Sequence, residues 1–164
     1  MVKISFKKIA EYLGYCFFLA LPFQVNFSFL GQEIYSSGFF NPFLSHFIYL
    51  GDIFLVGSLF CLGLAYLFGE KFEFRRDKVF SMILKTFVFF ILASLVFSVN
   101  FWNSFFYFLR FLEFFGLYIL IISGVFKIER IFLIFIGVMT FEALIGIGQY
   151  IFQSSLGLDF LGEP

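Results

Sequence analysis

The sequence predicts an all-α integral membrane protein, a polytopic bundle of about five transmembrane helices with a cytoplasmic N-terminus. Two properties of the composition lead to this fold class: 62% of the 164 residues are hydrophobic and only 13% are charged. An average soluble domain is about 45–50% apolar and about 25% charged. The third observation is that the apolar residues form long continuous runs, each with the ~20 residues that a ~30 Å hydrocarbon core requires.

Continuous apolar runs favour helices over strands. A strand of a transmembrane barrel needs only ~10 residues and alternates apolar with polar side chains, whereas the runs in this chain do not alternate. A helix also satisfies its own backbone N–H and C=O groups, as the interior of a bilayer demands. We therefore expect helical spans and disfavour strands.

The first two expected spans cover residues 9–29 and 43–68, separated by a polar segment rich in Gly, Ser and Asn. A basic N-terminus before an apolar run also occurs in signal peptides, but the residues around Pro22 offer no clear small-residue cleavage site, so we favour a retained span. Small residues recur at intervals of four in the second span and let another helix approach closely. They are Gly57, Cys61, Ala65 and Gly69.

The last three expected spans cover residues 79–99, 105–126 and 131–152. A charged loop precedes them, and polar turns at residues 100–104 and 127–130 connect them. No low-complexity linker divides the chain, so we expect residues 1–164 to form a single transmembrane domain.

Lysine and arginine predict the orientation. They gather before the first span, between the second and third, and between the fourth and fifth, while the other two connections have none. The positive-inside rule places such segments in the cytoplasm, so the N-terminus is expected inside and the residues after the fifth span outside. Lys85, one to two turns into the third span, can reach back to the cytoplasmic face. Trp102 and Tyr107 suit the outer aromatic belt.

Several classes of function lack their sequence signatures. Eleven Lys and Arg balance eleven Asp and Glu, so no basic surface indicates nucleic acid. Cys16 and Cys61 lie in apolar runs without metal-ligand spacing, and we expect neither a disulfide nor a metal site. No phosphate loop or nucleophile elbow is present, and the single histidine, His46, reads as an interfacial residue. We therefore predict no cofactor and assign no catalytic residue.

Ionisable residues inside the spans are costly in lipid and need an explanation. At ~1.5 Å per residue, Asp52 would lie ~14 Å below the outer end of the second span, near the midplane. Arg110 would lie ~8 Å inside the outer end of the fourth span, with Glu113 one turn deeper. Glu142 lies near the middle of the fifth span and shares one helical stripe with Gln149.

These positions allow two interpretations. In the functional one, they line an outward-opening polar cavity, in which Arg110 holds an anionic group such as a pyrophosphate through its planar donor fork. Asp52, Glu142 and Gln149 are then the other substrate-binding residues, with the acids orienting Arg110 or contacting sugar hydroxyls. In the structural one, Arg110 pairs with Glu113, Asp52 pairs with a neighbouring helix, and Gln149 joins helices.

Residues 142–164 read EALIGIGQYIFQSSLGLDFLGEP: a span ends in a Q-rich turn and is followed by an SLGL-type stretch and Gly-Glu-Pro. This segment resembles the O-antigen ligase / O-antigen polymerase superfamily of bacterial membrane glycosyltransferases. The rest of the chain is compatible with that family, with Leu-Pro-Phe at residues 21–23, Asp52 in the second span and Arg110 in the fourth.

The resemblance implies a multi-pass protein of the bacterial cytoplasmic (inner) membrane that transfers or polymerises undecaprenyl-pyrophosphate-linked glycans at the outer face, without a metal. Its partners would be the lipid bilayer and that lipid-linked glycan. In the family, a large external loop in the second half of the fold supplies the key Arg and His residues. The sequence stops before such a loop, so we expect the N-terminal part of a longer protein, inactive alone. Only Arg110 is carried over, as a contact of the carrier phosphate.

Two other functions stay open. A transporter or flippase half also places ionisable groups at the midplane, although no internal repeat is visible here. A non-catalytic membrane accessory subunit would use the small-residue ridge and the intramembrane charges as contacts with its partners.

Overall fold

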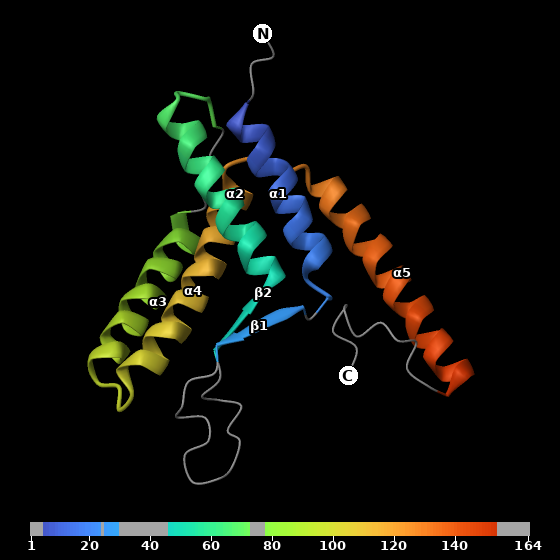
Figure 1. The fold of residues 1–164 in the computed structure, drawn as a ribbon. Coiled ribbons are helices and arrows are strands. Elements are labelled where there is room, and N and C mark those ends of the chain that lie inside the picture. The colour runs from blue at the N-terminus through green and yellow to red at the C-terminus, as the bar shows by residue number, and fades with distance from the viewer. Residues whose placement is uncertain (1–4, 24, 30–45, 73–77, 154–164) are drawn as a thin grey trace.

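The computed structural model describes residues 5–23, 25–29, 46–72 and 78–153. These residues form five helices and one two-stranded sheet (Figure 1). The elements in chain order are α1 (Phe6–Ala20), β1 (Asn26–Phe29), β2 (His46–Tyr49), α2 (Leu50–Leu67), α3 (Lys78–Val96), α4 (Phe101–Ile122) and α5 (Ile128–Phe152). The all-α prediction is confirmed apart from this small sheet.

Three of the helices in the described part of the chain, α2, α4 and α5, are long and apolar enough to cross a membrane. The apolar stretch of α3, Phe80–Val96, is a little shorter. With 15 residues, α1 extends over only ~22 Å at ~1.5 Å per residue. The structure therefore supports a membrane protein with three candidate spans, and five spans remain a prediction.

The first predicted span is too long. The sequence predicts a helix over residues 9–29, but α1 ends at Ala20, two residues before Pro22. Proline has no N–H to continue the helix and disfavours the helical conformation of the residue before it. The chain then leaves the helix axis and forms β1 where the sequence predicts the last turns of a span.

The second predicted span begins too early, because residues 46–49 form β2 instead of helix. The two strands pair antiparallel, with Asn26 opposite Tyr49 and Phe29 opposite His46. The preference for helices rests on the backbone demand of a long lipid-crossing run. A four-residue segment is not bound by that demand, and here it pairs part of its backbone groups with a neighbouring strand. His46, predicted as an interfacial residue, is the first residue of β2.

The last three helices agree closely with the predicted spans. The start of α4 lies at Phe101 rather than 105, because the Asn100 side chain caps the helix by accepting a hydrogen bond from the Asn103 N–H at 3.1 Å. Similarly, α5 begins at Ile128, inside the predicted turn at residues 127–130.

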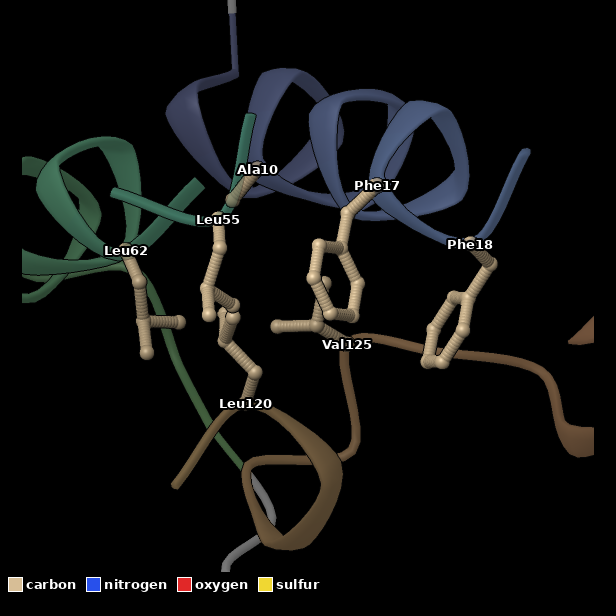
Figure 2. Close-up of a cluster of buried hydrophobic side chains, with 7 residues drawn as sticks. All are labelled: Ala10, Phe17, Phe18, Leu55, Leu62, Leu120 and Val125. Carbon is tan, nitrogen blue, oxygen red and sulfur yellow. The ribbon is translucent and has the colours of Figure 1, made fainter. Parts of the chain in front are cut away.

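The core lies where α1, α2 and the last turn of α4 meet (Figure 2). At this contact, the Ser58 hydroxyl of α2 donates to the Ala10 carbonyl oxygen of α1 at 2.7 Å, and both residues are fully buried. Such a hydrogen bond requires two closely approaching helices. The buried apolar residues are Ala10, Phe17, Phe18, Leu55, Leu62, Leu120 and Val125.

The predicted ridge of small residues on α2 contributes to this packing in part. A side chain at Gly57 would lie 3.5 Å from Leu13 of α1, and Ala65 is fully buried. Gly69 has a different role: its φ of +75° follows the end of α2, where glycine terminates a helix without strain. Cys16 and Cys61 are free and half-buried.

Basic residues of three separate connections meet at one end of the bundle, called the basic end below. Lys7 Nζ of α1 donates to the Lys71 carbonyl oxygen at 3.2 Å. Arg130 of α5 pairs with Glu11 of α1 at 3.3 Å. The backbone N–H of Lys127 donates to the Tyr15 hydroxyl at 3.2 Å. The segments expected on one membrane face therefore do lie together.

The outer helices expose apolar side chains. In Figure 1, α5 starts near α1 and then diverges from the other helices, while α3 packs along α4. Phe89 of α3 and Phe132 and Leu144 of α5 are each about two-thirds exposed. Large contiguous apolar surfaces of this kind are covered by lipid or by another protein.

Candidate functional site

Two of the four predicted site residues come together. Asp52 lies in the first turn of α2 and Arg110 in the middle of α4. Arg110 Nη1 lies 2.6 Å from Asp52 Oδ2 and 3.2 Å from Oε2 of Glu113, one turn further along α4. Arg110 Nη2 donates to the carbonyl oxygen of Phe47 in β2. Arg110 thus joins three elements, and Arg110, Asp52 and Glu113 are called the charged triad below.

Asp52 is held by the start of its own helix. The backbone N–H of Tyr49 donates to Asp52 Oδ2 at 2.7 Å, the contact that a carboxylate makes in a capping box. The prediction of Asp52 near the membrane midplane was wrong about its place in the helix. Because residues 46–49 are a strand, Asp52 lies in the first turn and not several turns along.

Aromatic rings surround the guanidinium group. The Arg110 Cζ lies 5.0 Å from the ring centroid of Tyr49 and 5.6 Å from that of Phe106. Such cation–π contacts are worth ~0.5–2 kcal/mol, more where water is excluded. The side chains of Arg110, Asp52 and Glu113 are only 22%, 14% and 26% exposed. Little water screens the attraction within the charged triad, so it is stronger than at a surface.

The charged triad lines a pocket of about 370 Å³ between the end of α1, the start of α2 and the middle of α4. The rest of the lining is apolar or aromatic and includes Phe17, Leu21, Phe23, Leu55, Phe114 and Leu117. A cavity of this size with apolar walls and a few convergent polar groups is typical of a small-molecule site.

The charges of the triad do not cancel. With both acids ionised, two carboxylates face one guanidinium group, a net charge of −1. Arginine offers five N–H donors, and the hydrogen bonds to Asp52, Glu113 and Phe47 use only Nη1 and Nη2. The Nε–H and one N–H of Nη2 make no hydrogen bond within the described part of the chain. Both belong to an arginine that lines the pocket.

The other two predicted site residues lie elsewhere. Glu142 and Gln149 are both on α5, which diverges from the bundle (Figure 1). Neither residue lines the pocket. Within the described residues, the structure therefore brings Arg110 together with Asp52 and Glu113 but not with the stripe on α5.

The ion pairs that the structural interpretation predicts for Arg110 and Asp52 are present. They line a pocket with mostly apolar walls, and the outward-opening polar cavity of the functional interpretation stays a prediction. Sequence reasoning missed the Phe47 carbonyl and the Tyr49 ring, because both were expected inside a helix. One signal was available: an acidic residue at 52 favours the first turn of a helix, and this places the start of α2 near residue 50.

Residues 142–152, where the resemblance to the O-antigen ligase / polymerase superfamily begins, are helical, and Gln153 ends α5 in the left-handed conformation with φ 50°. Residues 154–164 lie outside the described residues. Among the residues that are described, no group of three or more His, Cys, Asp or Glu could hold a metal ion. No family model, curated protein or solved structure matches this chain.

Proposed function

We propose that this chain is the N-terminal membrane portion of a protein that transfers or polymerises undecaprenyl-pyrophosphate-linked glycans, as the resemblance implies. The observation that carries the proposal is the pocket of about 370 Å³ in which Arg110 and two carboxylates meet apolar walls. A glycan-carrying polyprenyl pyrophosphate matches these two kinds of surface. Its head is anionic and carries sugar hydroxyls, and its tail is apolar.

In this proposal, Arg110 binds the pyrophosphate with the N–H donors that its protein partners leave unused. Charge-assisted hydrogen bonds from a guanidinium group to phosphate oxygens are short and strong. Asp52 and Glu113 fix the position of the guanidinium group, and their remaining lone pairs can accept hydrogen bonds from sugar hydroxyls.

The orientation is part of the proposal. The basic end faces the cytoplasm by the positive-inside rule, and the pocket, built from the opposite end of α2, then lies in the outer half of the membrane. Single-cysteine variants of a cysteine-free protein test this with a membrane-impermeant maleimide on intact cells. Trp102→Cys, at the α3–α4 turn, should be labelled and Lys8→Cys should not. Labelling of Lys8→Cys alone would show that the protein has the opposite orientation and would refute this part of the proposal.

Binding by the purified chain in nanodiscs tests the pocket. We expect undecaprenyl pyrophosphate to bind more tightly than undecaprenol, which has the same tail without the charge. Arg110→Gln should weaken pyrophosphate binding by about tenfold or more, since a hydrogen bond to a charged group is worth ~1.5–3 kcal/mol. Arg130→Gln is the matched control, because Arg130 also pairs with a carboxylate but lies at the basic end.

Glu113→Gln makes the test independent of folding. The two carboxylates beside Arg110 repel a phosphate bound to its unused donors, so removing one negative charge should strengthen pyrophosphate binding. A purely structural Arg110 predicts no change. Equal binding of undecaprenol and undecaprenyl pyrophosphate, or equal losses in Arg110→Gln and Arg130→Gln, would refute the proposed site.

Deleting the gene in its source organism tests the biological role. We expect shortened or untransferred surface glycans, restored by the wild-type gene and not by Arg110→Gln. A non-catalytic accessory subunit is the second candidate, favoured by the exposed apolar surface of α5. Co-purification with one protein at fixed stoichiometry, with glycans unchanged after deletion, would support that candidate instead.

A further inference from the structure

A second hollow, of about 250 Å³, lies between α3 and α4. Ser81 and Lys85 of α3 and Phe115, Tyr118 and Ile122 of α4 contribute to its lining. It shares no lining residue with the Arg110 pocket. Ile122 ends α4 next to the basic end, so this groove extends closer to the basic end than that pocket does.

Lys85 is a cation in the groove that has no partner among the described residues. Its side chain is exposed, and it makes no hydrogen bond or ion pair with any other described residue. An unpaired ammonium group inside an apolar helix is costly in a membrane unless it reaches an anion or the interface. Lys85 lies ~10 Å from the start of α3, and side chains lean towards the N-terminus of their helix, here the basic end.

The polar groups of the groove are all hydrogen-bond donors. The Tyr118 hydroxyl is buried and has no hydrogen-bond partner in the described part of the chain. A buried hydroxyl without a hydrogen bond is destabilising, so a ligand that accepts its proton is favoured. The Ser81 hydroxyl and the Lys85 ammonium group add further donors, and none of the described residues that line the hollow is a carboxylate. The charge that the described residues bring to the groove is therefore that of Lys85.

A neighbouring hollow continues the groove towards the basic end. It shares Ile122 with the groove, and its lining includes Lys127, just before α5, and Glu129, in the first turn of α5. Next to the groove, α3 exposes Phe80 and Ile83, which are each about half exposed. A ligand in this place meets a cation at the basic end and an apolar surface beside it.

We propose that this groove binds the phosphate of an anionic phospholipid from the leaflet at the basic end. The lysine and the hydroxyls contact the phosphate, and the acyl chains lie along the exposed apolar side of α3. Basic pockets between transmembrane helices recognise lipid head groups in this way. The inference rests on the chain being embedded in a membrane and is independent of the ligand of the Arg110 pocket.

The test is native mass spectrometry of the full chain released from nanodiscs of phosphatidylcholine and phosphatidylglycerol. We expect the wild type to retain phosphatidylglycerol in preference to phosphatidylcholine. Lys85→Gln should lower that affinity by about fivefold, the effect of ~1 kcal/mol for one lysine near an anionic surface. Lys85→Arg should retain the lipid, and Tyr118→Phe should lose less affinity than Lys85→Gln.

Lys78→Gln is the matched control, because it removes the same charge from the first residue of the same helix without touching the groove. Equal losses in Lys78→Gln and Lys85→Gln would show a diffuse surface attraction and overturn the site. Unchanged retention in Lys85→Gln would overturn it as well. Saturable binding of inorganic phosphate in pure phosphatidylcholine, abolished by Lys85→Gln, would identify a soluble phosphate as the ligand and overturn the lipid assignment.

Discussion

Glu70 holds the start of α1 from outside the helix, and its removal gives the most direct test of the structure. Its carboxylate accepts hydrogen bonds from the Phe6 N–H at 2.9 Å and the Lys7 N–H at 3.3 Å, two donors that a helix start leaves unpaired. It also accepts a hydrogen bond from the Ser5 hydroxyl at 2.8 Å. Ser5 is the N-cap residue, but it donates to Glu70 and makes no side-chain cap of its own.

The expected loss follows from these contacts. Replacing an N-cap acceptor by alanine costs ~1 kcal/mol, and a negative charge beside the first turn contributes ~0.3–1 kcal/mol through the helix dipole. The hydrogen bond from Ser5 adds ~0.5–1 kcal/mol. We therefore expect Glu70→Ala to lower the free energy of unfolding by about 2 kcal/mol. Glu70→Gln keeps an acceptor oxygen but loses the charge, so about 1 kcal/mol is expected.

The free energy of unfolding can be measured by SDS titration in mixed micelles. Glu129 provides the matched control, because it lies in the first turn of α5 and accepts no hydrogen bond there from a described residue. Glu129→Ala should therefore lose only the dipole contribution, ~0.5 kcal/mol. If Glu70→Ala were no more destabilising than Glu129→Ala, Glu70 would not cap α1, and the contact between α1 and the end of α2 would be wrong.

Two further predictions concern the packing of α1 and are measured in the same titration. Gly14→Ala should destabilise by ~1–3 kcal/mol, because the added methyl would overlap the ring of Phe126, in the connection between α4 and α5. Gly63→Ala, with open space around it, should stabilise by up to ~1 kcal/mol through helix propensity. A similar effect of both changes would place Gly14 away from Phe126. Ser58→Ala should cost ~1 kcal/mol by removing the buried hydrogen bond to Ala10, whereas a cost below ~0.3 kcal/mol would contradict that bond.

The apolar runs predict the helices well where the local signals agree with them. The bounds of α3 and α5 lie within a few residues of the predicted spans, since long uninterrupted apolar segments have few ways to pair their backbone groups outside a helix. The prediction of the first two spans is wrong in the segment that connects them. Pro22 stops α1, and the chain that follows pairs with residues 46–49. This pairing is long-range, so neither segment signals it locally.

The sequence predicts which residues are candidates for the site but does not predict which of them contact one another. The cost of charge in lipid singles out Asp52, Arg110 and Glu142 equally. The structure brings Asp52 and Arg110 together because α2 and α4 share the core, and it separates Glu142 from them because α5 diverges from the core. Helix spacing predicts contacts within one helix, such as Arg110 with Glu113. It carries no information on which helices are neighbours, and this decides which charges meet.

The two sequence interpretations of Arg110 are compatible once its donors are followed individually. An arginine that served packing alone would be most stable with every N–H paired, because each unpaired buried donor is costly. Arg110 instead has two donors without a partner in the described part of the chain, beside a pocket of about 370 Å³. The carboxylates and the Phe47 carbonyl fix the guanidinium group, so a ligand would meet donors that are already oriented. In the proposed function, ion pairing with Asp52 and Glu113 orients Arg110 for an anionic ligand in addition to joining α2 and α4.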